Sequence, residues 1–145
     1  MKKQLVLSIA LFSLSSLSLA TSLSSLNSTQ AKNALSDKTI TTVSEVTLNG
    51  NLVENSFTGY FNKDGTMTGK FANALSDGTP QTDKGTWKVG TNGQFCITWQ
   101  TWDHGQQRCV TFYKLNNALL VIGPGNKFET LILDNNIQNG NQMSA

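Results

Sequence analysis

Apolar and polar residues alternate along most of this chain from Val43 onward. Short runs rich in Thr, Val, Ile, Phe, Tyr and Trp are separated by dipeptides in which Gly follows Asn, Asp or His. This spacing is typical of short β-strands joined by tight turns. No stretch repeats the i, i+3, i+4 apolar spacing of an amphipathic helix. The pattern predicts an all-β domain over residues 43–134, with about eight strands.

The clearest strand pair lies in the middle of the chain. Asn92-Gly93 predicts a type I′ hairpin turn, because both residues tolerate positive φ. One face of the hairpin carries the apolar side chains Phe95, Ile97, Trp99, Val110 and Phe112. The apolar stripes of the two strands meet only if Cys96 and Cys109 also share a face. Alternation therefore predicts a cross-strand disulfide on the less apolar side of the hairpin.

Strands at hairpin spacing predict a small antiparallel meander. The strand pattern is compatible with two architectures, a closed lipocalin-like barrel and a curled sandwich. Closure of the sheet removes its exposed edges, which suits a monomer. One disulfide, Cys96–Cys109, would supplement a core of this size.

The first 20 residues have the three parts of a secretory signal peptide. Lys2 and Lys3 precede an apolar stretch over residues 5–19, and Ser18-Leu19-Ala20 places small residues before a cleavage site. We therefore expect an exported protein, either periplasmic or secreted. An oxidising compartment favours a structural disulfide over a redox pair, and no C-x-x-C motif is present.

The two flanks of the β domain differ from it in composition. Residues 21–42 are rich in Ser, Thr and Asn without a sustained period, which predicts a flexible polar arm. Residues 135–145 are polar and predict a disordered tail.

Several motifs within residues 47–142 follow one another in a fixed order, G-T-W…C-x-x-W…R-C. The motifs are Leu48-Asn49-Gly50-Asn51, Tyr60-Phe61-Asn62-Lys63-Asp64-Gly65-Thr66, Gly69, Lys84-Gly85-Thr86-Trp87-Lys88-Val89, Asn92-Gly93-Gln94-Phe95-Cys96, Trp99, Gly105, Arg108-Cys109, Tyr113 and Asn139-Gly140-Asn141. On these residues the chain resembles a family of small exported bacterial proteins defined by a domain of unknown function. The resemblance implies export and a small β domain, and it implies no activity. Gly85-Thr86-Trp87 is also similar to the G-x-W of lipocalin-like and avidin-like barrels, but lies mid-chain, so that likeness concerns architecture alone.

Charge narrows the range of partners. Charged residues make up 14% of the chain, against roughly 25% in an ordinary soluble domain. Without Lys2 and Lys3, nine basic residues balance nine acidic ones. A balanced charge argues against nucleic acid and against an anionic membrane surface as partners. After the leader, no segment is apolar and long enough to span a membrane.

The sequence contains few combinations of residues that are typical of catalytic or metal-binding sites. One His and two Cys make a zinc site improbable, and no phosphate-binding loop or G-x-S-x-G elbow occurs. We expect no metal, no cofactor, no catalytic residue and no enzymatic activity. A hydrolase built around His104 and Asp103 is the remaining enzymatic alternative.

One hairpin loop gathers the residue types that proteins use to bind partners. Trp102, Asp103, His104 and Arg108 lie within it, and Arg108 is the only arginine. We expect these four residues to form the binding site of a non-enzymatic β-barrel module, whose partner is a small apolar ligand or a protein. The alternative is a secreted inhibitor that docks the stapled hairpin into a protease or lysozyme. In a purely structural interpretation, Trp102 packs over the mouth of the barrel as a core residue.

Overall fold

The protein is described by a computed structural model, which covers residues 23–48 and 51–143. Its elements in chain order are α1 (Ser28–Leu35), β1 (Lys38–Thr41), β2 (Glu45–Leu48), β3 (Asn51–Glu54), β4 (Phe57–Phe61), β5 (Thr66–Phe71), β6 (Thr82–Val89), β7 (Phe95–Trp99), η1 (Trp102–Gly105), β8 (Gln107–Lys114), β9 (Ala118–Gly123), η2 (Pro124–Asn126), β10 (Lys127–Leu133), η3 (Asp134–Asn136) and β11 (Ile137–Asn139). The predicted signal peptide, residues 1–20, lies outside the described residues.

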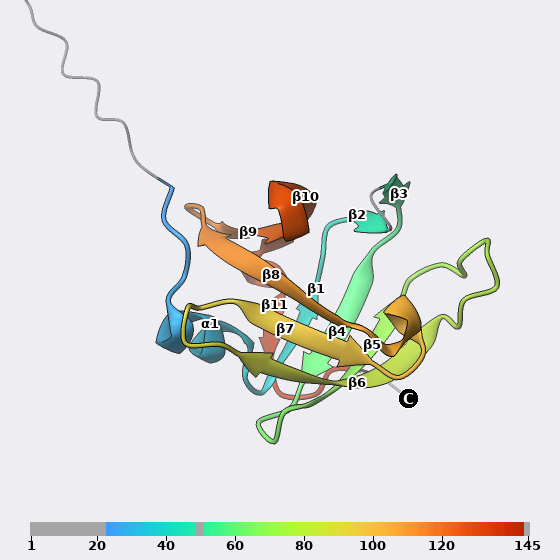
Figure 1. The fold of residues 1–145 in the computed structure, drawn as a ribbon, viewed down its shortest axis with the longest axis horizontal. Helices are drawn as coiled ribbons and strands as arrows, with labels where there is room; N and C mark the ends of the chain where they lie inside the picture. Colours follow the sequence, from blue (N-terminus) through green and yellow to red (C-terminus); the bar gives the residue numbers. More distant parts are fainter. Residues whose placement is uncertain (1–22, 49–50, 144–145) are drawn as a thin grey trace, which may run out of the picture.

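Nine antiparallel strands form one strongly curled sheet in the order β10-β9-β8-β7-β6-β5-β4-β1-β11 (Figure 1). From β4 to β10 each strand pairs with the next, as expected of a meander. The segment after β1 reaches across to β10, where Val43 N–H donates to the Leu131 carbonyl at 3.0 Å. Thr130 Oγ1 donates to the Glu45 carbonyl at 2.9 Å beside it. The all-β prediction is confirmed, and the sheet forms a nearly closed barrel rather than a sandwich.

The disulfide between Cys96 and Cys109 is confirmed. The two cysteines lie directly opposite each other on β7 and β8, and Phe95 lies opposite Val110 in the next pair. Because side chains alternate along a strand, the apolar partners face the barrel interior and the disulfide lies on the outside. The register deduced from the sequence is therefore correct.

The hairpin before β7 is present, but its turn is not type I′. Gly93 has φ of 81°, whereas Asn92 has no positive φ. Gly90 N–H donates to the Gln94 carbonyl at 2.8 Å, which closes a wider loop. A Cβ at Gly93 would lie 2.3 Å from the backbone oxygen of Leu26, so this glycine also makes room for the N-terminal segment.

The expectation of a flexible arm is wrong for residues 23–42. A capping box starts α1, because Asn27 and Gln30 exchange side-chain-to-backbone hydrogen bonds of 2.9 Å each. Ala31 and Leu35 bury one face of this helix, at 0% and 1% exposure. After it, β1 pairs with β4 and places Ile40 in the core. The segment is ordered despite its polar composition, because its few apolar residues are buried. They lie first on one face of a helix and then on a strand.

The expectation of a disordered tail is also wrong, for residues 135–143. Strand β11 pairs with β1 at the end of the sheet. Beyond it, Thr39 Oγ1 donates to the Gly140 carbonyl at 2.7 Å and accepts from Gln142 N–H at 2.9 Å. The β domain therefore extends well beyond residues 43–134 on both sides. Residues 21–22 and 144–145 lie outside the described residues.

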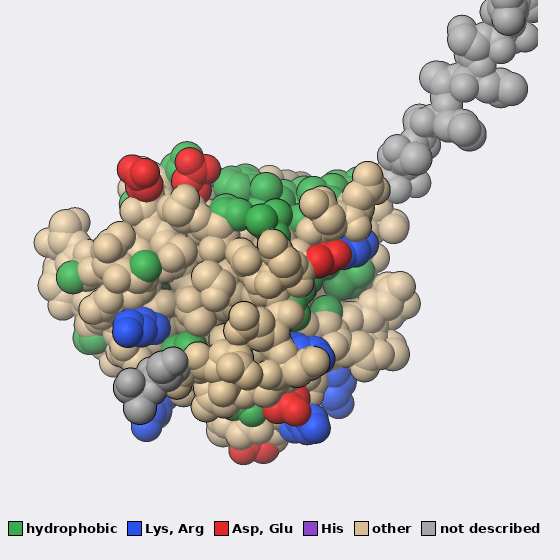
Figure 2. Space-filling view, turned by 180° about the vertical axis from the view of Figure 1, so that it is seen from behind, with side chains coloured by type: hydrophobic (Ala, Val, Ile, Leu, Met, Phe, Trp, Pro, Cys, Tyr) green, Lys and Arg blue, Asp and Glu red, His purple; other side chains and the backbone are tan. Residues whose placement is uncertain are grey.

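Backbone and side chains that are neither charged nor hydrophobic make up most of the face of the molecule seen from behind (Figure 2). Charged side chains are scattered singly or in small groups over it, in keeping with the low charged fraction of 14%. Within residues 23–48 and 51–143, no helix has the length and apolar character needed to cross a bilayer.

Candidate functional site

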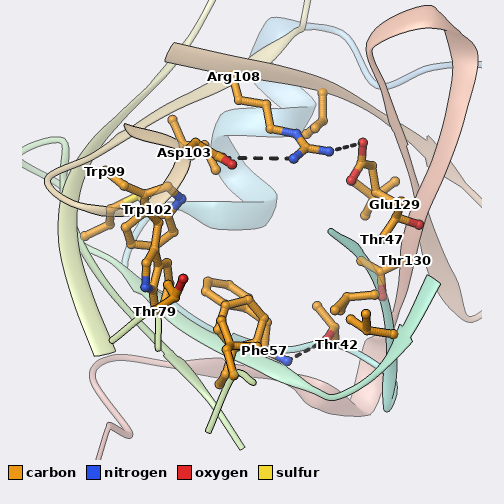
Figure 3. Close-up of a pocket in the computed structure, with 18 of the residues that line it drawn as sticks. Thr42, Thr47, Phe57, Thr79, Trp99, Trp102, Asp103, Arg108, Glu129 and Thr130 are labelled. Atoms are coloured by element: carbon orange, nitrogen blue, oxygen red, sulfur yellow. Dashed lines mark hydrogen bonds and ion pairs between the residues drawn. The ribbon is translucent and has the colours of Figure 1, made fainter. Parts of the chain in front are cut away.

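The barrel encloses a cavity of about 660 Å³, within the range of small-molecule sites (Figure 3). Its deeper part is lined by inward-facing apolar side chains, among them Leu35, Ile40, Phe61, Phe95 and Phe112. Leu35 comes from α1, which lies behind the opening in Figure 3 and closes the far end. Thr42, Thr47, Thr79 and Thr130 add hydroxyls to the lining. The helix missed by the sequence analysis is thus part of the cavity wall.

An aromatic wall lines one side of this cavity. The Trp99 and Trp102 ring centroids are 4.6 Å apart, and Phe57 packs edge-on against both, at 5.9 and 6.3 Å. The Phe71 ring centroid lies 4.9 Å from that of Trp102 and 5.8 Å from that of Phe57. Edge-to-face contacts of this kind fix ring orientations, so the wall is rigid.

Trp102 is a core residue in this structure. It is 7% exposed, and its indole N–H donates to the Pro80 carbonyl at 2.7 Å. The Asp83 carboxylate accepts the backbone N–H groups of Thr101 and Trp102 at 2.8 Å each. These bonds hold the loop η1 over the cavity, and the ring forms part of its wall rather than an exposed ridge.

Arg108 points into the cavity. It lies opposite Ile97 on β7 and shares its strand face with Val110 and Phe112. Its guanidinium donates a hydrogen bond to Glu129 and lies 4.0 Å from the Asp103 carboxylate, as Figure 3 shows. The Arg108 side chain is 22% exposed and that of Glu129 is 11% exposed. One cation is therefore held between two carboxylates at the rim.

Glu129 is the residue that sequence reasoning missed. A β-bulge between Phe128 and Thr130 breaks the register with β9, and Glu129 and Thr130 are both buried. In a bulge two successive side chains can share a face, which simple alternation does not predict. Gly123 makes room for the carboxylate, since a Cβ there would lie 1.8 Å from Glu129 Oε1.

Asp103 and His104 occupy the loop between β7 and β8. Both adopt left-handed backbone conformations, with φ of 52° and 55°, followed by Gly105 at 69°. This run directs Asp103 toward Arg108, whereas the His104 side chain is largely exposed. Among the described contacts, no hydrogen bond or ion pair joins His104 to Asp103. All four predicted site residues line the cavity, but their binding role stays a prediction.

Asp77 is a further carboxylate in the cavity lining. The backbone N–H of Thr79 donates to it at 2.9 Å, and this bond, with help from the Thr79 hydroxyl, lowers the pKa of Asp77. Asp77 is therefore ionised at neutral pH. In the part of the chain that the structure describes, no group of three or more His, Cys, Asp or Glu side chains could hold a metal ion.

Replacement of Arg108 by Met is expected to lower the free energy of unfolding by about 2 kcal/mol, because a mostly buried Glu129 carboxylate loses its partner. Replacement of both residues, Arg108→Met with Glu129→Leu, is expected to restore stability to within about 1 kcal/mol of the wild type. Urea unfolding followed by circular dichroism measures both. A double variant no more stable than Arg108→Met would contradict this coupling.

No family model matches the chain, and the comparison with curated proteins found no match. The resemblance to the exported bacterial family therefore stays a prediction.

Proposed function

We propose that this protein is an exported, non-enzymatic β-barrel that binds a small, mostly apolar molecule in its interior. The observation that carries the proposal is the cavity of about 660 Å³, apolar at depth and polar at its rim. A few polar groups around an apolar hollow are the usual composition of a small-molecule site. Aromatic side chains that line this cavity also pack against one another, which holds its wall in place.

Export is supported by two independent features. The leader-like pattern of residues 1–20 fits secretion. The disulfide between Cys96 and Cys109 fits an oxidising compartment, because such bonds are rare in the cytosol of mesophiles.

Protein docking is the second candidate. Inhibition of a hydrolase by the stapled hairpin would need an exposed apolar anchor, and Trp102 is 7% exposed. A different surface favours docking: apolar side chains gather over β9 and β10 (Figure 2). Leu120 pairs with Leu131 and Ile122 with Phe128 there, on the face opposite to the buried Leu119 and Val121.

Replacement of Ile97 by Trp tests the proposed function. Ile97 lines the cavity, so a larger side chain there is expected to fill the hollow and to weaken binding of the neutral apolar probe N-phenyl-1-naphthylamine by about tenfold or more. Thr98→Trp is the matched control, because Thr98 points to the other face of the same strand. Probe fluorescence in a titration gives the dissociation constants, and circular dichroism checks that both variants fold. Equal binding by the two variants would place the probe outside the barrel.

A further inference from the structure

Acidic side chains outnumber basic ones in the described lining of the cavity. Within the described part of the lining, Asp77, Asp103 and Glu129 supply three carboxylates, and Arg108 supplies the one guanidinium. No lysine lies among these lining residues. With His104 neutral, the rim carries a formal excess of two negative charges. Such a field in a partly enclosed hollow favours cations and repels anions.

Arg108 is not free to receive an acidic ligand. Its two terminal nitrogens already face carboxylates, one of them hydrogen-bonded to Glu129. A ligand carboxylate at the nitrogen bonded to Glu129 would displace that 11% exposed side chain and leave it without a partner, and one at the other terminal nitrogen would meet the Asp103 carboxylate. Uncompensated buried charge is costly, so the ion pair works against fatty-acid binding.

Asp103 is the acceptor best placed for a cation. Its carboxylate lies 4.0 Å from Arg108, beyond hydrogen-bond distance, and its side chain is 32% exposed. Figure 3 places it on the same side of the opening as Trp99 and Trp102. Ammonium groups are attracted both to carboxylates and to the faces of indole rings.

We propose that the cavity selects amphipathic molecules with one cationic head group, an inference that rests on the proposed function. The head lies at the rim beside Asp103 and the aromatic wall, and the apolar body lies in the barrel. The same rim discriminates against molecules of equal length that end in a carboxylate.

Three decyl compounds distinguish the effect of head-group charge on binding from the effect of burying the alkyl chain. Decylammonium, decanol and decanoate have the same chain and carry positive, zero and negative charge at neutral pH. Each is titrated into the full-length mature protein as a competitor of N-phenyl-1-naphthylamine, below the concentration at which it aggregates. Decylammonium is expected to bind about tenfold more tightly than decanoate, with decanol between them. Added salt is expected to narrow this difference, because the rim is partly exposed.

Asp103→Asn tests the assigned acceptor. Asn tolerates the left-handed backbone of position 103, so this variant removes the charge and retains the loop. Its preference for decylammonium over decanoate is expected to shrink severalfold, and its affinity for uncharged decanol is expected to change less than its affinity for either charged compound. Asp64→Asn, in a turn whose carboxylate does not line the cavity, is the control and is expected to keep the full preference.

The outcomes separate the two proposals. Decanoate binding as tightly as decylammonium, or an Asp103→Asn variant with full preference, would overturn the charge selection and leave the proposed function standing. Failure of all three compounds to displace the probe would overturn the proposed function itself.

Discussion

Replacement of Trp102 by alanine is expected to lower the free energy of unfolding by about 4 kcal/mol. The ring is 7% exposed and packs against Phe57, Phe71 and Trp99, and its N–H donates to the Pro80 carbonyl. Removal deletes these contacts and leaves a hole in the aromatic wall, which the rigid sheet around it cannot close. Urea unfolding followed by far-ultraviolet circular dichroism gives the value.

Phe128→Ala is the matched control for that variant. Phe128 is 40% exposed on the outside of β10, so its truncation is expected to cost less than about 1 kcal/mol. Equal stability of Trp102→Ala and the wild type would instead mean that the η1 loop is a detachable tip, with Trp102 available to a partner.

Replacement of both cysteines by serine is expected to lower the free energy of unfolding by about 3 kcal/mol, because a closed loop restricts the unfolded chain. The bond joins residues 13 apart in sequence on the outside of the β7–β8 hairpin. Since neither sulphur lines the cavity, binding of the naphthylamine probe is expected to be unchanged at temperatures where the variant stays folded.

A reducing agent provides the control for the disulfide. It is expected to destabilise the wild type by a similar amount and to leave the double serine variant unaffected. Two free thiols in the mass spectrum of the protein purified from its native source would contradict a structural role for Cys96 and Cys109.

Strand alternation predicted the part of the site that lies in regular sheet. The same alternation that pairs Cys96 with Cys109 also places Arg108 on the inner face with Val110 and Phe112. Hairpin spacing predicted the meander, because each strand from β4 to β10 pairs with its neighbour in sequence.

Irregular and long-range features were not predictable in this way. Glu129 turns inward at a bulge, and strand alternation does not reveal where a bulge occurs. Strand β11 pairs with β1, although the two strands lie far apart in the sequence. Neither strand has the run of apolar residues that marks a strand in a sequence. The start of α1 did carry a readable feature, the Asn27–Gln30 capping box, but eight residues with few apolar positions gave no helical period.

The position of a bound ligand tests the central claim most directly. A crystal of the protein without residues 1–20, soaked with 10-bromodecan-1-ol, would locate the end of the alkyl chain by the anomalous scattering of bromine. The expected result is a bromine peak inside the barrel, beside the apolar side chains of Phe61 and Phe95 that line the cavity. A bromine peak only on the outer face of β9 and β10, with the interior filled by the protein's own side chains, would contradict it.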